Sequence, residues 1–138
     1  MAYWLFKSEP NTWGWDDQVK KGAPEEWDGV RNYQARNNMR EMKVGELGFF
    51  YHSIKEKRIV GVARVAAEAH QDSTTDDERW ECVDIEAVTA FETPITLDDI
   101  KAHPDLGDMV LVNNSRLSVQ PVSEKEWKTI CKMGGVKA

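Results

Sequence analysis

Apolar positions along the chain fall into short runs, which is typical of strands. Residues 3–6 are aromatic or aliphatic throughout and predict a buried strand inside a sheet. Residues 47–53 and 59–65 are two further apolar runs on either side of a basic turn, so we expect them to form a hairpin. Alternating apolar and polar residues predict a longer strand over residues 80–91, with Pro94 ending it.

Capping residues predict helices between and after these strands. Asn11 or Thr12 can cap a helix that Gly22 ends. Residues 96–99 and 123–126 have the spacing of a capping box, in which the side chains of the first and fourth residues bond to each other's backbone. We therefore expect a short helix after the long strand and another near the end of the chain.

A fourth helix is expected from an Asn32 cap to Met42, and it carries two stripes of side chains. Residues three or four apart lie on one face of a helix, so each stripe should keep its own orientation. The inward stripe consists of Ala35, Met39 and Met42, and the basic stripe consists of Arg36, Arg40 and Lys43.

The remaining segments complete the prediction of the fold. Residues 116–122 alternate like a further strand, and residues 109–112 are one more apolar run, whereas residues 23–26 and 70–78 are polar and expected to be loops. Five or six strands, mostly in hairpin order and flanked by helices, favour a small closed or nearly closed barrel. We therefore expect one α+β domain that covers residues 1–138.

Composition is that of an ordinary globular protein, with 138 residues, 41% of them hydrophobic and 30% charged. Cys82 and Cys131 stand alone, without the spacing of a zinc site or a disulfide framework, and suit a reducing cytosol. No signal-like leader and no stretch of roughly 20 apolar residues is present. We expect a cytoplasmic monomer with no bound metal, no cofactor and no membrane contact.

The net charge of −6 argues against a non-specific nucleic-acid binder, but the charge is unevenly placed. Residues 31–64 carry a net +5 and residues 109–138 a net +3, whereas residues 65–108 carry a net −11. Two interpretations remain open, a basic face made by the two positive segments or a solvated surface of mixed charge. Charge alone favours the mixed surface.

The densest candidate chemistry lies in residues 27–40, where two aromatics, three arginines and three asparagines surround Gly29. Aromatic faces stack on flat ligands, and amide and guanidinium groups bind the edges of such ligands. This composition favours a pocket for a nucleobase. Stacking can come from Trp27, Tyr33 and Tyr51, edge contacts from Asn32 and Ser53, and phosphate contacts from Arg31, Arg36 and Arg116.

Catalysis has weaker support in the sequence. His70 and His103 lie in predicted polar loops, and His52, beside Ser53, is better explained as a hydrogen-bonded strand histidine than as a base. No nucleophile-elbow, zinc-protease, phosphate-loop or dinucleotide motif is present. We therefore expect a binding protein rather than an enzyme.

Five stretches resemble the EVE-domain family, and they occur in the family's order over nearly the whole chain. They are YWLFKSEP at residues 3–10, WDGVRNYQARNNMR at 27–40, FFYHS at 49–53, VGV at 60–62 and RLSVQPV at 116–122. The resemblance implies a PUA-like fold, a pseudo-barrel of five to six mixed strands with flanking helices, related to the YTH and SRA modules. It also implies that the protein reads a modified base, modified cytosine first, in DNA or RNA.

The resemblance also implies which residues form the pocket that takes a flipped base. The pocket residues would be Lys7, Ser8, Trp27, Arg31, Asn32, Tyr33, Ala35, Tyr51, His52, Ser53, Arg116 and Ser118. Contacts to the phosphate backbone would come from Arg36, Asn37 and Arg40. Two alternatives remain: a pocket for a small metabolite such as a nucleoside, and an enzyme acting on a modified nucleotide with His52 as acid or base.

Overall fold

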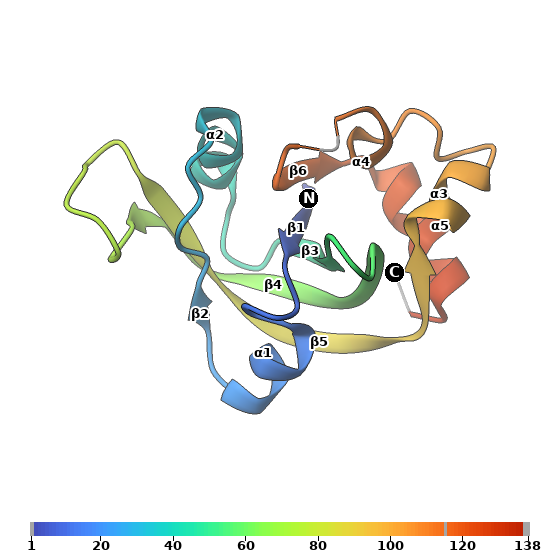
Figure 1. Cartoon of the computed structure of the whole chain (residues 1–138), viewed down its shortest axis with the longest axis horizontal. Helices are drawn as coiled ribbons and strands as arrows, with labels where there is room; N and C mark the ends of the chain where they lie inside the picture. Colours follow the sequence, from blue (N-terminus) through green and yellow to red (C-terminus); the bar gives the residue numbers. More distant parts are fainter. Residues whose placement is uncertain (1, 115, 137–138) are drawn as a thin grey trace.

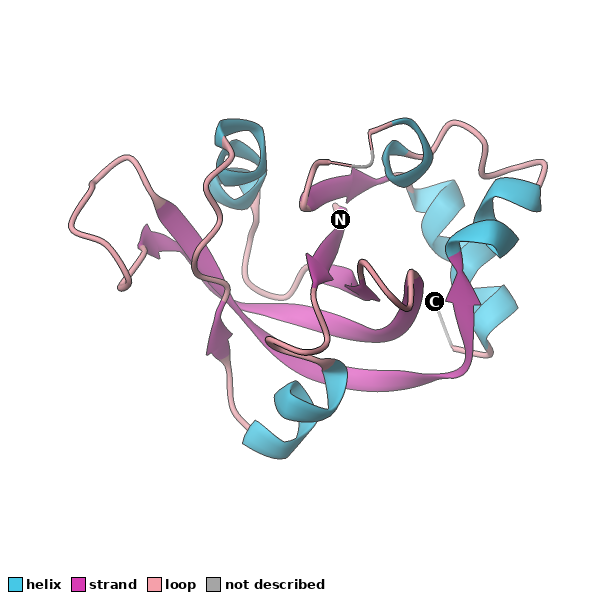
Figure 2. Cartoon of the chain, in the orientation of Figure 1, coloured by secondary structure: helices cyan, strands magenta, loops and turns pink. Residues whose placement is uncertain are grey.

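Six strands form one mixed sheet with the order β2-β5-β4-β3-β1-β6 (Figure 1). The computed structural model describes residues 2–114 and 116–136. The strands are β1 (Tyr3–Ser8), β2 (Glu25–Glu26), β3 (Leu47–His52), β4 (Arg58–Gln71), β5 (Glu81–Thr96) and β6 (Val119–Val122). The helices are α1 (Trp15–Lys21), α2 (Tyr33–Glu41), α3 (Leu97–Ala102), α4 (Val110–Asn113) and α5 (Glu124–Gly134), shown in cyan in Figure 2.

Strand β1 lies inside the sheet, as its apolar sequence predicts. It runs parallel to β3, with Leu5 opposite Phe49, and antiparallel to β6, with Leu5 opposite Gln120. The other strand pairs are antiparallel. Strands β2 and β6 end the sheet and do not pair with each other within the described chain, so the sheet is mixed but not closed. The predicted mixed sheet of five to six strands with flanking helices is therefore confirmed, and the fully closed barrel is wrong.

Two apolar clusters hold the helices to the sheet. Because neighbouring strand residues point to opposite faces, Phe6 and Phe50 enter one cluster, and Leu5 and Phe49 enter the other. The first cluster receives α2 through Ala35, Met39 and Met42, which confirms the inward stripe. The second receives α5 through Trp127, whose ring stacks on Tyr3 and Phe49 at centroid distances of 4.5 and 4.0 Å.

Gly61 lets α1 approach the sheet closely. A Cβ atom on Gly61 would lie 2.6 Å from the Trp15 ring, so only glycine fits at this point of β4. The register of β3 and β4 shifts here, since Phe50 pairs with Gly61 and Tyr51 with Ile59. The expected bulge or tight bend at Gly61 is thereby confirmed.

Most helix ends agree with the capping signals. Asn32 caps α2, and capping boxes begin α3 at Thr96 and α5 at Ser123. Gly22 ends α1 with a φ of 61°. The start of α1 was predicted wrongly: residues 9–13 form a turn in which the N–H groups of Thr12 and Trp13 donate to Glu9 O, and the helix begins after Gly14.

Five other elements differ from the predictions. Strand β5 continues through Pro94 to Thr96, because a proline is tolerated where the strand needs no N–H for its ladder. Residues 25–26, expected as loop, pair with β5 as β2. Strand β4 extends through His70 to Gln71, and β6 begins only at Val119. The apolar run around residue 110 forms the short helix α4.

Candidate functional site

A cavity of about 550 Å³ opens between the end of β1 and the segment from β2 to Arg31. This volume falls within the range of small-molecule sites in proteins. The lining residues are Lys7, Ser8, Glu9, Thr12, Trp13, Glu25, Glu26, Trp27, Asp28, Gly29, Val30, Arg31 and Ser118. Five predicted pocket residues thus meet at one cavity, namely Lys7, Ser8, Trp27, Arg31 and Ser118.

Backbone hydrogen bonds bring these distant segments together at the end of β1. The N–H of Lys7 donates to Ser118 O at 2.9 Å, which ties β1 to the approach to β6. The N–H of Ser53 donates to Ser8 O at 2.9 Å, and Ser8 Oγ donates to Trp13 O at 2.5 Å. Burial lowers the pKa of Lys7, whose ammonium lies 5.9 Å from the centroid of the Tyr51 ring.

Trp27 is a rigid wall of the cavity because most of its surface is committed to the core. Only 7% of the residue is exposed, and its ring meets Phe6 and Phe50 edge-on at 5.5 Å in both cases. Its backbone N–H donates to Val83 O at 2.8 Å. The cavity therefore receives a fixed indole surface rather than a mobile ring.

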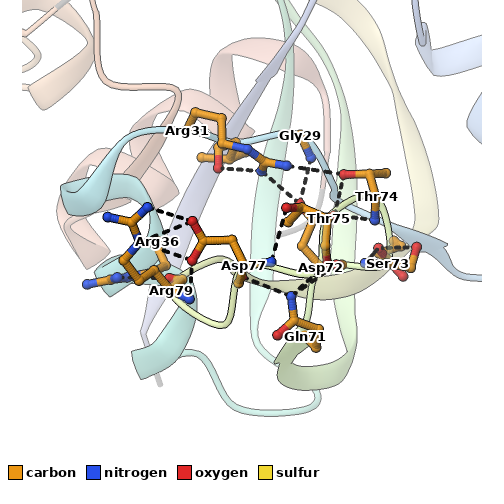
Figure 3. A network of polar contacts seen from close by, with 12 residues as sticks. Gly29, Arg31, Arg36, Gln71, Asp72, Ser73, Thr74, Thr75, Asp77 and Arg79 are labelled. Carbon is orange, nitrogen blue, oxygen red and sulfur yellow. Dashed lines mark hydrogen bonds and ion pairs between the residues drawn. The ribbon is translucent and has the colours of Figure 1, made fainter.

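The buried carboxylate of Asp72 holds the turn after Trp27 (Figure 3). Its Oδ2 accepts from Gly29 N at 2.9 Å and from Arg31 Nη1 at 3.0 Å, and its Oδ1 accepts from Thr74 N at 2.8 Å. Gly29 has a φ of 76°, a conformation that favours glycine. Burial opposes ionisation of Asp72, but the donors from Thr74, Gly29 and Arg31 outweigh it and lower its pKa to about 2.

Aromatic and cationic side chains alternate beside the cavity, on the loop between β4 and β5 and on α2. The rings of Tyr33 and Trp80 stack at 4.9 Å. The Arg31 guanidinium lies 5.4 Å from the Trp80 ring centroid, and that of Arg36 lies 4.9 Å from the Tyr33 ring centroid. Tyr33 is 50% exposed and lies outside the cavity, with its hydroxyl accepting from Arg79.

Several other predicted pocket residues have structural contacts elsewhere. Asn32 Oδ1 accepts from Ala35 N at 2.9 Å as the cap of α2, and Ala35 is fully buried. Tyr51 lies in the second apolar cluster, where burial raises its pKa to about 12. Arg116 is exposed and does not line the cavity. Ser53 reaches the site only through its backbone bond to Ser8.

His52 uses both ring nitrogens within the fold. Its Nε2 accepts from the backbone N–H of Trp15 at 3.0 Å, and its Nδ1 donates to Glu56 Oε1 at 2.9 Å. The hydrogen bond from His52 is the main reason that the pKa of Glu56 is lowered. His52 therefore fixes the first turn of α1, as expected of a hydrogen-bonded strand histidine.

Of the side chains expected at phosphates, Asn37 and Arg40 are exposed and Arg36 is half-buried, and all three have intramolecular partners. Arg36 donates to Asn37 Oδ1 and to Arg79 O. Arg40 forms an ion pair with Glu81. Phosphate binding by Arg36, Asn37 and Arg40 therefore stays a prediction. Such binding would require these side chains to exchange their intramolecular partners for phosphate oxygens.

Trp13 and Asp28 line the cavity and were not predicted. Trp13 was assigned to the first helix, but it lies in the turn before α1 and its Nε1 donates to Gln18 Oε1 at 3.0 Å. Partial burial, then the charges of Asp72 and Glu26, raise the pKa of Asp28. The signal for Asp28 in the sequence is its position directly after Trp27.

A group of possible metal ligands borders the cavity, with ligand atoms of Glu26, His70 and Cys82 within 4.8 Å of one another. His70 donates from Nδ1 to Gln71 O at 3.0 Å and from Nε2 to Asp84 Oδ1 at 2.8 Å. Burial opposes protonation of His70, but these bonds outweigh it and raise its pKa. Burial also raises the pKa of the Cys82 thiol. Because both His70 nitrogens already have partners, metal binding by this group would require these hydrogen bonds to be exchanged.

Sequence comparison identifies one family over nearly the whole chain. The model of the EVE domain matches residues 2–133. Human thymocyte nuclear protein 1 is 36% identical in an alignment that covers 91% of this chain and 71% of the human protein. The chicken protein of the same name is 35% identical and is covered over 66% of its length. The chain thus spans about two thirds of these curated relatives.

Solved structures agree with the predicted PUA-like fold. A protein from Agrobacterium tumefaciens is 54% identical with a TM-score of 0.96, over 99% of this chain and 94% of that one. The human THYN1 protein, in complex with 5-methylcytosine containing DNA, is 32% identical with a TM-score of 0.88 over the full length of both chains. A YTH domain from Zygosaccharomyces rouxii shares the fold at 19% identity and a TM-score of 0.59. Within the described chain, no helix is long and apolar enough to cross a membrane.

Proposed function

The chain belongs to the EVE-domain family, and from this premise we propose that it is a non-enzymatic reader of a modified base, modified cytosine first, in DNA or RNA. The supporting observation is the cavity of about 550 Å³ that Trp13 and Trp27 line. A relative with the same fold, the human THYN1 protein, has been solved with 5-methylcytosine containing DNA. In our proposal the base leaves its stack and enters this cavity.

Energies of the right size are available for this binding mode. Flipping a base out of a duplex costs a few kcal/mol. Stacking on an aromatic side chain returns roughly 1–3 kcal/mol per base. A buried methyl group adds about 0.8 kcal/mol, which corresponds to roughly a fourfold preference over the unmodified base. The cavity must therefore supply most of the affinity through stacking and hydrogen bonds, and the modification only the final preference.

Residue roles follow from which side chains line the cavity and which do not. Trp27 supplies one fixed wall and Trp13, held by its hydrogen bond to Gln18, a second aromatic wall. Ser8 and Ser118 supply hydrogen-bonding groups at the end of β1. Asn32 and Ser53, predicted as edge contacts, have structural contacts instead, so we assign them positioning roles.

The enzymatic alternative has less support than binding. It requires His52 as acid or base, and both His52 nitrogens are hydrogen-bonded within the fold. His52 is also absent from the cavity lining. The small-metabolite alternative uses the same cavity and differs in predicting that phosphate contacts are unnecessary.

The test is a tryptophan-fluorescence titration with two duplexes that differ only in one 5-methylcytosine. We expect the methylated duplex to bind roughly fourfold more tightly. Trp13→Ala should weaken binding to both duplexes by roughly tenfold, since a stacking face is lost. Trp27→Ala is a poor test because it also removes a core side chain.

Tyr33→Ala is the matched control, since it removes an aromatic that lies outside the cavity. Its affinity for both duplexes should remain within about twofold of the unaltered protein, given that exposed contacts contribute little. Equal affinity for methylated and unmethylated duplexes, in DNA and in RNA, would contradict the proposed function. A Tyr33→Ala loss as large as that of Trp13→Ala would place the base elsewhere.

A further inference from the structure

We propose that Asp28 is the specificity residue of this cavity, where its carboxylate accepts a hydrogen bond from the exocyclic amine of cytosine and rejects the carbonyl of thymine. The inference rests on the proposed function and adds a choice between two bases that carry the same methyl group. 5-Methylcytosine and thymine share ring shape and methyl group, and they differ in an amine or a carbonyl at the same carbon and in the proton on N3.

Asp28 is the carboxylate best placed to accept from a ligand. Within residues 2–114 and 116–136 it lines the cavity and makes no ion pair or hydrogen bond through its side chain. Of the other lining carboxylates, Glu25 pairs with Lys21 at 2.7 Å, and Glu26 accepts from Ser73 N and Oγ at 2.8 Å each. Glu9 also makes no side-chain bond among the described residues, but it follows β1 and is not adjacent to the rigid Trp27. An Asp28 carboxylate with unused acceptor sites is therefore available to a donor that enters the cavity.

The backbone on both sides of Asp28 is fixed. The N–H of Trp27 donates to Val83 O at 2.8 Å, and the N–H of Gly29 donates to the buried carboxylate of Asp72 at 2.9 Å. Asp28 also directly follows the rigid Trp27 ring that walls the cavity. A short side chain on an anchored backbone loses little conformational entropy when it binds, which favours selective recognition.

Charge around Asp28 favours a donor over an acceptor. Partial burial raises the pKa of Asp28, and the negative charges of Asp72, Glu26 and Glu25 raise it further against the opposing positive charge of Arg31. An amine N–H relieves this accumulation of negative charge. A carbonyl oxygen in the same position adds to it and leaves the carboxylate without a partner, so thymine is penalised twice.

The experiment measures binding of three oligonucleotides that carry 5-methylcytosine, cytosine or thymine at one position opposite an abasic site. The abasic site removes base pairing, so the three bases pay no different pairing cost on leaving the helix. We expect the protein to prefer 5-methylcytosine over thymine by at least tenfold, the size of a good side-chain-to-base contact.

Asp28→Asn is the decisive variant, because an amide has the same shape and can donate to the thymine carbonyl. We expect the preference for 5-methylcytosine over thymine to fall below about twofold or to reverse. Asp76→Asn makes the same chemical change at an exposed carboxylate outside the cavity lining and should keep the original preference. Both variants should unfold at the same temperature as the unaltered protein, since neither Asp28 nor Asp76 makes a side-chain hydrogen bond or ion pair among the described residues.

The outcomes separate this inference from the proposed function. An unaltered preference in Asp28→Asn, or a preference lost equally in Asp76→Asn, overturns the role of Asp28. If the protein prefers 5-methylcytosine over cytosine but binds 5-methylcytosine and thymine equally, the role of Asp28 is overturned and the proposed function stands. Absence of binding to all three oligonucleotides overturns the proposed function itself.

Discussion

The Asp72 carboxylate joins two segments that are 43 residues apart in the chain, the Gly29 turn of the cavity and the loop after β4. Its side chain is only 2% exposed, so the buried charge depends on its donors. Replacing it would leave the N–H groups of Gly29 and Thr74 without their partner and release Arg31. We regard Asp72 as the residue that determines the shape of the cavity wall.

Asp72→Asn should remove a pH-dependent part of the stability. The pKa of Asp72 is lowered from 3.8 to about 2 on folding, and each pKa unit corresponds to ~1.4 kcal/mol. A lowered pKa stabilises the fold above the unfolded value and loses this effect as pH falls through the folded value. In urea denaturation, the unaltered protein should exceed the variant by about 2 kcal/mol at pH 6, and this difference should shrink as pH falls from 4 to 2.

Asp76→Asn is the control for this measurement. Asp76 lies in the same loop, is exposed and makes no ion pair or hydrogen bond through its side chain among the described residues, and its substitution changes the charge equally. The unfolding free energy of the Asp76→Asn variant should equal that of the unaltered protein at every pH. A difference between the unaltered protein and Asp72→Asn that is independent of pH would show that the carboxylate charge is not what stabilises the turn.

At residue scale, the density of aromatic and hydrogen-bonding side chains around Gly29 predicted Trp27, which lines the cavity. Ser8, also in the lining, was implied only by the family resemblance. From the sequence alone, the buried residues Tyr51 and Ala35 could not be distinguished from residues that face the pocket. The spacing of side chains does not reveal which face of a strand or helix packs against the core. Asp72 could not be found at all, since its partners lie far away in sequence.

Elements with local signals were predicted well, and elements that depend on distant partners were not. Side-chain caps at Asn32, Thr96 and Ser123 identify the starts of three helices, because the capping bonds form within four residues. Strand β2 has two residues and exists only because β5 lies beside it. Pro94 was taken as a strand end because its effect depends on whether the missing N–H faces a neighbouring strand.

The cap of α2 provides a prediction at this scale. Asn32→Ala should lower the unfolding free energy by about 1 kcal/mol, since Ala35 N loses its acceptor. Asn32→Ser keeps a capping oxygen and should retain both the stability and the oligonucleotide affinity of the unaltered protein. Thermal unfolding and binding titrations of the two variants measure this. If Asn32→Ser folds normally but loses affinity, Asn32 contacts the base directly and our positioning role is wrong.

At the scale of the whole molecule, the acidic segment supplies partners to the basic one. Asp72 pairs with Arg31, Glu81 with Arg40 and Glu86 with Arg64. The solvated mixed surface, favoured by charge alone, is therefore confirmed for these arginines. In a protein with a net charge of −6, arginines that already pair with carboxylates can neutralise phosphates only by losing those partners.

This charge arrangement predicts a shallow salt dependence for binding to duplex DNA. Each neutralised phosphate contributes about 0.9 to the slope of log K against log salt. Two or three contacts should give a slope of roughly −2 to −3, measured by fluorescence titration over a range of salt concentrations. Arg116→Gln should reduce the slope by about one unit, because Arg116 is exposed and forms no ion pair among the described residues.

Arg64→Gln is the control, since this arginine is bound to Glu86 and should leave the slope unchanged. A slope near zero, with the free nucleoside binding as tightly as the oligonucleotide, would favour the small-metabolite alternative over a nucleic-acid reader. A slope steeper than about −6 would mean that the arginines exchange their carboxylates for phosphates on binding. The slope therefore decides whether the cavity alone selects the ligand or whether the surface around it also takes part.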